Sequence, residues 1–235
     1  MQPPTDSALL GIWERGHGRN PVERALLVLA AALPESDGER LAALSIGERD
    51  ATILRLRRAT FGTQLPGCVV CPRCGETLEF ELDADHLLPG LRAPAECEFT
   101  IGDGLRFRLP DSRDLLAVAH CANADAAGQQ LLQRCCLNAP DAREWPQTLR
   151  AEIEARMAAL DDAAEIRLQF DCISCGQTWA DQLDIACYFW EEIEQHARRL
   201  LDEVHWLAAR YGWAEAQILA MSAARRNAYL QRWVA

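Results

Sequence analysis

Cysteine is the residue type in this chain whose spacing points to chemistry. Two turns repeat one pattern, Cys71-Pro-Arg-Cys74-Gly and Cys172-Ile-Ser-Cys175-Gly. In a zinc knuckle, two thiolates separated by two residues face one ion, and the following glycine takes the positive φ that the tight turn needs. Because tetrahedral Zn²⁺ takes four ligands, the sequence predicts one structural Zn²⁺ per chain, held by Cys71, Cys74, Cys172 and Cys175.

The same spacing leaves alternatives open. Cys68-x-x-Cys71 is also a CxxC pair, so Cys68 competes with Cys71 or Cys74 as a ligand, although the glycine after Cys74 favours the Cys71/Cys74 pair. The 98 positions from Cys74 to Cys172 far exceed ordinary ribbon spacing and predict a long insertion. Thiol–disulfide exchange is disfavoured, because Cys74 leads into a strand and not a helix. The other six cysteines are expected to be small buried packing residues.

Length and charge narrow the class of protein. The 235 residues suit one large or two small domains, and 49% hydrophobic with 25% charged residues excludes a wholly disordered chain. The net charge of −11 argues against nonspecific binding to nucleic acid or to an anionic membrane. The start lacks a signal-like pattern, and the longest apolar run, residues 25–33, is too short to insert in a membrane. We therefore expect a cytoplasmic protein.

The elements next to the cysteine turns are predicted to be strands. Residues 78–82 and 166–170 alternate apolar and polar side chains, so each turn lies on a small hairpin and the two form a zinc ribbon. A further hairpin is predicted from residues 98–109 with its turn at 102–104, and helices are predicted at 110–137 and 147–160.

Helices dominate the two ends of the chain. Residues 5–62 read as helical, and apolar residues three or four apart predict one long helix from Asp184 to Tyr211, ended by Gly212. Two short helices follow. The expected fold is α+β and predominantly helical, with the ribbon holding the N-terminal helices against the long helix. The predicted units are 1–64 (helical), 65–96 (first knuckle), 97–162 (insertion), 163–183 (second knuckle) and 184–235 (C-terminal helices).

No catalytic site is predicted. The histidines show no metal or nucleophile spacing, and paired acids such as Glu191-Glu192 point apart on a helix. The end of the chain combines aromatic and basic residues, which favours a partner-binding surface. Its predicted members are Trp213, Arg225, Arg226, Tyr229 and Trp233.

Several segments carry a family resemblance. They are Ile12-Trp-Glu-Arg-Gly-His-Gly-Arg-Asn-Pro-Val-Glu-Arg-Ala-Leu26, Leu41–Asp50 with Thr60-Phe-Gly62, the two cysteine turns, Arg106-Phe-Arg-Leu-Pro-Asp-Ser-Arg-Asp-Leu115, and Val204–Trp213 with Ile218–Ser222 and Arg225–Leu230. Together they resemble the T-even-type baseplate hub assembly chaperone family of contractile-tailed phages and phage-tail-like contractile injection particles.

The resemblance implies a non-enzymatic assembly chaperone or minor component of the baseplate hub. Its implied partners are hub, tube or spike proteins of the same particle, with assembly in the cytoplasm and either release from or incorporation into the particle. The rival class is a zinc-ribbon module that binds nucleic acid, which would need a basic face where Glu79, Glu81 and Asp181 stand. A third class is an enzyme with reactive thiols at Cys71.

Overall fold

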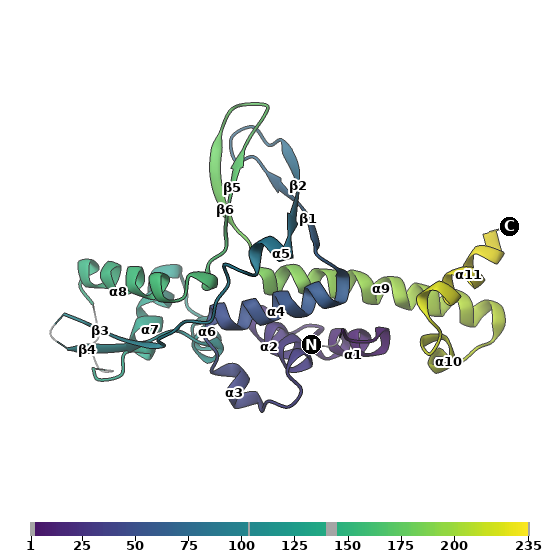
Figure 1. Ribbon diagram of the computed structural model, residues 1–235, viewed down its shortest axis with the longest axis horizontal. Helices are drawn as coiled ribbons and strands as arrows, with labels where there is room; N and C mark the ends of the chain where they lie inside the picture. The colour runs from purple at the N-terminus through teal and green to yellow at the C-terminus, as the bar shows by residue number, and fades with distance from the viewer. Residues whose placement is uncertain (1–2, 103, 140–144, 235) are drawn as a thin grey trace.

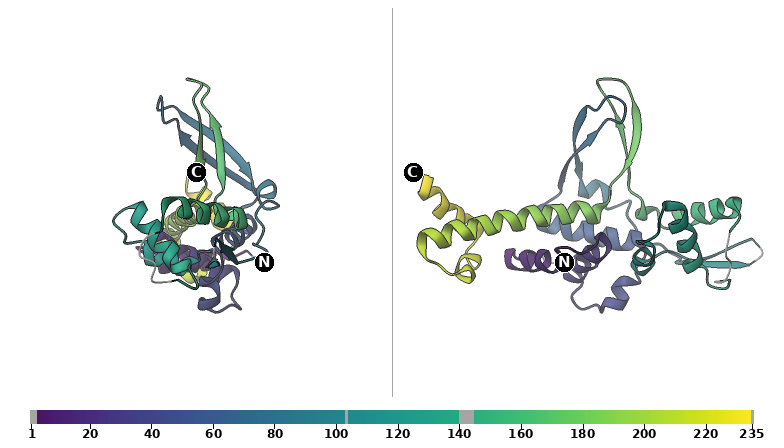
Figure 2. Two further views of the ribbon diagram at one scale, coloured as in Figure 1. Left: turned by 90° about the vertical axis from the view of Figure 1, so that its left-hand side faces the viewer. Right: turned by 180° about the vertical axis from the view of Figure 1, so that it is seen from behind.

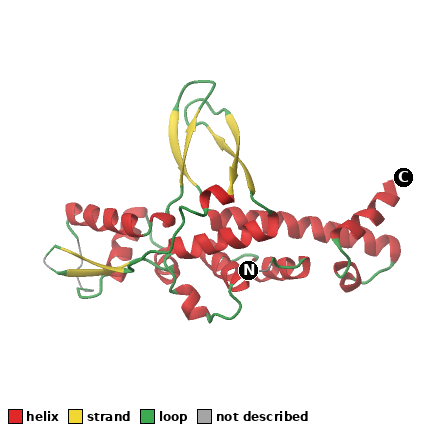
Figure 3. Cartoon of the chain, in the orientation of Figure 1, coloured by secondary structure: helices red, strands yellow, loops and turns green. Residues whose placement is uncertain are grey.

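The chain forms an elongated arrangement of helices from which two β-hairpins project (Figure 1). The computed structural model describes residues 3–102, 104–139 and 145–234, and the side chains of residues 233 and 234 are outside the description. Helices make up most of the chain and the strands lie in three separate two-stranded antiparallel sheets (Figure 3). The prediction of an α+β, helix-rich fold is therefore confirmed. No helix among the described residues is long and apolar enough to cross a membrane.

Four capped helices form the N-terminal part of the chain. They are α1 (Asp6–Gly16), α2 (Pro21–Ala32), α3 (Gly38–Ala42) and α4 (Ile46–Phe61). At the start of α4 the Ser45 hydroxyl accepts a hydrogen bond from the Glu48 amide at 3.3 Å, and at its end Gly62 has a φ of 92°. The Ser45 side chain satisfies a backbone N–H that has no partner within the helix, and the positive φ of Gly62 turns the chain out of the helix. These two residues therefore fix where α4 starts and stops.

Helix α9 (Ile185–Tyr211) runs along the long axis of the molecule (Figure 1). Its N-cap is Asp184, which accepts from the Cys187 amide at 2.9 Å, and Gly212 ends it in the left-handed conformation. The apolar face of α9 packs directly against α1, α2 and α4 in one core that includes Leu9, Ile53 and Phe189. We call α1, α2, α4 and α9 the helical body.

The direct packing corrects one expectation. The ribbon was expected to hold the N-terminal helices against the long helix, but the apolar side chains of the helices do so themselves. The hairpins instead project away from the helical body, as all three views show (Figures 1 and 2). The reason is that α1, α2 and α4 each carry an apolar stripe that must be buried, and α9 offers the matching face.

Two hairpins carry the cysteine turns, and we call them the knuckle hairpins. The first pairs β1 (Gln64–Val70) with β2 (Thr77–Asp83), and the second pairs β5 (Arg167–Asp171) with β6 (Thr178–Gln182). Short helix α5 (Ala84–Leu87) follows the first. At their base, Leu65 is buried with Leu54 of α4 and Ile185 of α9, so the hairpins are anchored to the body at one end.

Residues 97–162 form a segment with its own apolar cluster. It contains β3 (Glu98–Ile101), β4 (Leu105–Arg108), α6 (Ser112–Val118), α7 (Ala124–Cys135) and α8 (Gln147–Leu160), and the 3₁₀ turn η1 (Asp162–Ala164) follows. Phe99, Phe107 and Ile153 are buried in this cluster. The predicted hairpin is confirmed, although Asp103 of its turn lies outside the described residues. The predicted helix 110–137 is two helices, because the chain leaves the helix after Val118 and Asn123 caps a new one.

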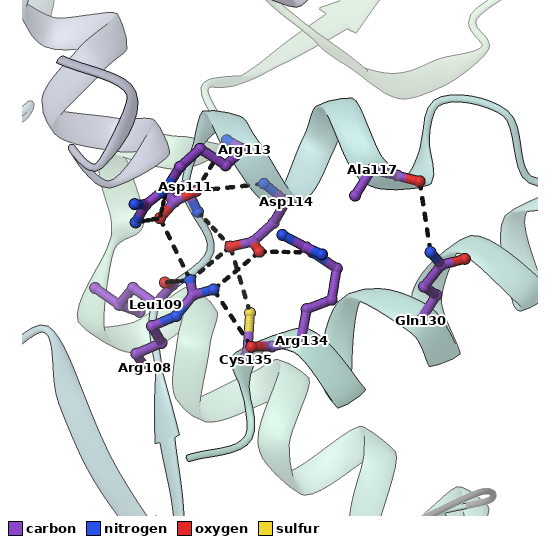
Figure 4. Close-up of polar contacts among 9 residues, drawn as sticks. All are labelled: Arg108, Leu109, Asp111, Arg113, Asp114, Ala117, Gln130, Arg134 and Cys135. Carbon is purple, nitrogen blue, oxygen red and sulfur yellow. Dashed lines mark hydrogen bonds and ion pairs between the residues drawn. The ribbon is translucent and has the colours of Figure 1, made fainter. Parts of the chain in front are cut away.

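A buried charge network ties β4 to α6 and α7 (Figure 4). The Asp114 side chain is fully buried, and its carboxylate accepts two hydrogen bonds from the Arg108 guanidinium and one from Arg134 at 2.9 Å. Asp111 caps α6 by accepting from the amides of Arg113 and Asp114. Burial would raise the pKa of Asp114, but Arg108, the Asp111 amide and Arg134 lower it below its ordinary value.

A second network fixes the C-terminal helices α10 (Glu215–Leu219) and α11 (Ala223–Val234) at the far end of α9. Arg226 is 2% exposed, and its guanidinium donates to Glu203 of α9 and to Asp6 of α1, each at 2.6 Å. His196 contacts the same Asp6 carboxylate at 2.9 Å. Arg226 therefore links three helices from inside the structure.

Candidate metal centre

The two cysteine turns have the same backbone geometry. In the first, the Cys71 amide donates to the carbonyl of Glu76 at 2.8 Å, and the Gly75 amide donates back to the carbonyl of Cys71 at 3.0 Å. In the second, the Cys172 amide donates to Gln177 and the Gly176 amide to Cys172, each at 2.9 Å. Gly75 and Gly176 have φ of 75° and 68°, a conformation that favours glycine over residues with a Cβ.

The turns bring four sulfurs together at the far end of the knuckle hairpins. We call Cys71, Cys74, Cys172 and Cys175 the cysteine quartet. Their Sγ atoms all lie within 4.8 Å of one another, with 3.7 Å from Cys71 to Cys175 and 3.6 Å from Cys74 to Cys172. A tetrahedron with Zn–S bonds of about 2.3 Å has sulfur–sulfur edges of roughly 3.8 Å. The sulfur positions therefore fit a single tetrahedral ion.

Within the quartet, the pKa of Cys71 is lowered and the pKa values of Cys74 and Cys175 are raised. Burial opposes ionisation of Cys71, but the amides of Cys74 and Arg73 and the neighbouring sulfurs lower the pKa of Cys71 to about 7. At Cys74 the Glu76 amide favours the thiolate, yet burial and the other thiols raise the pKa of Cys74 to about 12. Without a cation, four adjacent thiols cannot all ionise, and a divalent metal removes that conflict by supplying positive charge.

Aromatic side chains join the knuckle hairpins below the quartet. Phe80 of β2 and Phe170 of β5 meet with ring centroids 5.1 Å apart, and Trp179 packs on Phe170 at 5.6 Å. Gly67 makes room for this contact, because a Cβ there would lie 2.4 Å from the Phe80 ring. Over the described residues, no backbone ladder joins one hairpin to the other. Their mutual placement thus depends on these rings, the base and the sulfurs.

The remaining cysteines are placed differently from expectation. Cys135 and Cys136 are buried in the cluster of residues 97–162, as expected. Cys68 and Cys97 are exposed, and Cys121 and Cys187 are half-buried, so the expectation that all six are buried is wrong. Cys68 lies within strand β1, opposite Glu79, and is not among the four clustered sulfurs.

The structure separates the predicted partner-binding residues. Trp213 stacks on Tyr211 with ring centroids 4.5 Å apart, and the Tyr229 ring meets Trp213 edge-on with centroids 4.8 Å apart. Arg225 is exposed beside the Tyr229 ring. Arg226 is buried in the network with Asp6 and Glu203 and is not available on the surface.

Trp233 lies in α11, but its side chain is outside the described residues. Arg232 is exposed, lies within 5.8 Å of the Tyr229 ring centroid, and was not among the predicted partner-binding residues. We call Tyr211, Trp213, Arg225, Tyr229 and Arg232 the C-terminal cluster.

Sequence reasoning missed the buried ion pairs. Arg57 is 2% exposed and donates two hydrogen bonds to Glu192 across α4 and α9, at 2.8 and 2.5 Å. The Asp111–Asp114 spacing after a proline was the one local sign of such a network, since it matches a capping box. The Arg57 and Arg226 pairs span 135 and 220 positions and have no local signal.

Comparison with known proteins identifies the family of the chain. A family model described as T4 bacteriophage base plate protein matches residues 17–190. That range contains α2, α4, both knuckle hairpins and the start of α9. Comparison with curated proteins and with solved structures gave no match. Because the family model covers well over half of the sequence, the chain belongs to the family of T4 bacteriophage base plate proteins.

Proposed function

We propose that this protein is a non-enzymatic assembly chaperone or minor component of the baseplate hub in a contractile phage tail or phage-tail-like injection particle. The observation that carries the proposal is the family match over residues 17–190. The elongated body and projecting hairpins support a role in contact with other proteins, because they expose several separate faces (Figure 1). Its partners would be hub, tube or spike proteins of the same particle.

The proposal includes one structural Zn²⁺ on Cys71, Cys74, Cys172 and Cys175. It is supported by the four sulfurs within 4.8 Å of one another and by the matched turns that hold them. Four thiolates complete the tetrahedral shell and leave no open position for substrate, which is typical of a structural and not a catalytic site. The metal would act as a cross-link between hairpins that share no backbone ladder.

The C-terminal cluster is the proposed partner surface. Arg225 and Arg232 flank the Tyr229 ring at 5.9 and 5.8 Å, and Tyr211 is 37% exposed beside them. Aromatic and arginine side chains are the residues most enriched in the energetic centres of protein interfaces. Neither arginine has a carboxylate partner among the described residues, so both are available to a second protein.

Capture of hub, tube and spike proteins by the purified chain tests the proposal. The substitution Arg225→Glu with Arg232→Glu is preferable to deleting residues 212–235, because deletion also removes Arg226 and uncovers the apolar face of Val204 and Leu207. We expect capture to fall by about tenfold or more with the charge reversal. The matched control reverses Arg40 and Arg55, which are exposed on α3 and α4. Equal capture by both variants would reject the C-terminal cluster as the partner surface.

A further inference from the structure

A hollow of about 460 Å³ opens between the knuckle hairpins and the first turns of α9. Its wall is apolar, with Val69, Phe80, Leu168 and Phe170 contributed by both hairpins. Tyr188 of α9 closes the base by donating a hydrogen bond from its hydroxyl to the carbonyl of Pro66 at 2.8 Å. A concave apolar wall of this size accepts one or two large side chains of a partner.

Acidic side chains also line the hollow. Asp181, Glu191 and Glu192 line it together with neutral side chains, and no arginine is among the lining residues described. Glu192 is already paired with Arg57, whereas Asp181 accepts only from the adjacent Gln182 amide and Glu191 has no partner among the described residues. Two carboxylates beside an apolar wall are complementary to aromatic side chains flanked by arginines.

The C-terminal cluster has that complementary chemistry. It presents Tyr211 and the half-buried Tyr229 with two arginines that lack a carboxylate partner in the described part of the chain. We propose that the C-terminal cluster of one chain docks in the acidic hollow of a second copy, so that the protein self-associates head to tail.

The two surfaces cannot meet within one chain. Glu191 lies in the second turn of α9 and Tyr211 is its last residue, twenty positions later. At about 1.5 Å per residue, α9 holds them roughly 30 Å apart. The hairpins and helices α10 and α11 indeed lie at opposite ends of this helix (Figures 1 and 2). The contact therefore joins different copies.

Such a contact uses two different surfaces, so a docked pair of chains leaves one hollow and one C-terminal cluster free. The assembly either closes into a ring or extends as an open chain of copies. This inference goes beyond the proposed function but shares the C-terminal cluster with it. The two are distinguishable, because self-association is measured with the purified chain alone and capture is measured with baseplate proteins.

Sedimentation velocity of the full-length chain over a wide concentration range tests the inference. We expect the weight-average mass to rise with concentration and to fall at high salt, since screening weakens exposed charge pairs. Glu191→Arg with Asp181→Arg, or Arg225→Glu with Arg232→Glu, should each weaken the association by about tenfold or more. The chain that carries all four substitutions restores opposite charges and should associate to within about threefold of the unmodified chain.

The control is Glu14→Arg with Glu39→Arg, which makes the same charge change on exposed residues of α1 and α3 and should leave the association unchanged. Circular dichroism of every variant verifies that the helices are intact. A chain that stays monomeric at all concentrations would overturn the inference. So would an association that neither pair of substitutions weakens, or a fourfold variant that stays as weak as its parents. A baseplate protein seated in the hollow instead would appear as the first of these outcomes.

Discussion

The knuckle hairpins and the helical body are held together by different means. In the helical body, Leu9, Ile12, Phe189 and Ile193 are buried in one continuous core. In the four strands of the knuckle hairpins, Leu65 at the base is the one buried side chain among the described residues, and the other inward positions are half-exposed. Isolated two-stranded hairpins are marginal in water, so this region needs a cross-link that the body does not need.

The stability of the knuckle hairpins should depend on a metal ion, and the stability of the helical body should not. An apolar core stabilises through burial and is indifferent to metal, whereas a four-sulfur site ties the folding of its surroundings to the ion. We therefore expect the two regions to respond to different perturbations. A perturbation of one region should leave the other region unchanged, and the largest effect is expected from loss of the metal.

Loss of the proposed Zn²⁺ should have the largest effect and should be confined to the hairpins. Structural Zn²⁺ on cysteine ligands contributes an apparent free energy on the order of 10 kcal/mol to the fold around it. Chelation, or Cys172→Ser, should remove the protection of the amides in 64–83 and 167–182 in hydrogen exchange. The amides of α9 and α4 should keep theirs. Uniform loss of protection across the chain would show that the regions are not separable.

Phe189→Ala is the converse experiment. Phe189 is fully buried in the core of the helical body, and removing a buried phenylalanine side chain costs about 3–5 kcal/mol. Denaturant unfolding followed by circular dichroism should show this loss, while zinc content stays unchanged. Leu201→Ala on the same helix is the matched control, since Leu201 is 36% exposed and should cost about 0.5 kcal/mol or less. Loss of zinc together with helix stability would contradict the separation.

Asp114→Asn tests the segment of residues 97–162, which combines a core with a charge network. The substitution leaves Arg108 and Arg134 without their shared carboxylate and should cost about 2–3 kcal/mol, less than for fully buried pairs because both arginines reach solvent. Asp125→Asn, at an ion pair whose aspartate is 71% exposed, should change stability by about 0.5 kcal/mol at most. Similar losses in both variants would show that burial of the Asp114 network carries no special weight.

The pH dependence should differ between two carboxylates of this segment. The pKa of Asp114 is lowered, so its stabilisation is present above the ordinary carboxyl pKa and is lost as pH falls through the folded-state value. Asp161 accepts a hydrogen bond from the Gly47 amide at 3.0 Å, and burial raises its pKa. The contribution of Asp161 to the free energy of unfolding is therefore present at low pH and is lost as pH rises through its folded-state pKa.

Asp114→Asn should therefore flatten the acid side of the stability profile. Asp161→Asn should keep the bond from Gly47 and change stability at neutral pH by about 1 kcal/mol or less, in the stabilising direction. Thermal unfolding between about pH 3 and about pH 7 measures the effects of both substitutions on stability, because this range brackets the ordinary carboxyl pKa of about 3.9. Steepening of the acid side by Asp114→Asn would contradict the assigned direction.

The parts of this structure that sequence reasoning reached are those with local signals. Asp184 and Gly212 mark the ends of α9 through capping chemistry, and the repeated CxxCG pattern brings two distant turns to one site. The contacts that join elements escaped prediction. Arg226 looks like a surface residue in a basic stretch, and only the tertiary fold places Asp6 and Glu203 around it. Burial of an arginine depends on partners that no local spacing encodes.

One metal ion on the cysteine quartet is proposed to hold the knuckle hairpins together. Native mass spectrometry of the purified chain tests it most directly, with Cys74→Ser and Cys68→Ser as paired variants. We predict one zinc ion per chain, lost in Cys74→Ser and retained in Cys68→Ser, because Cys68 is outside the cysteine quartet. A folded chain without metal, or a Cys68→Ser variant that loses the ion while Cys74→Ser keeps it, would contradict the account.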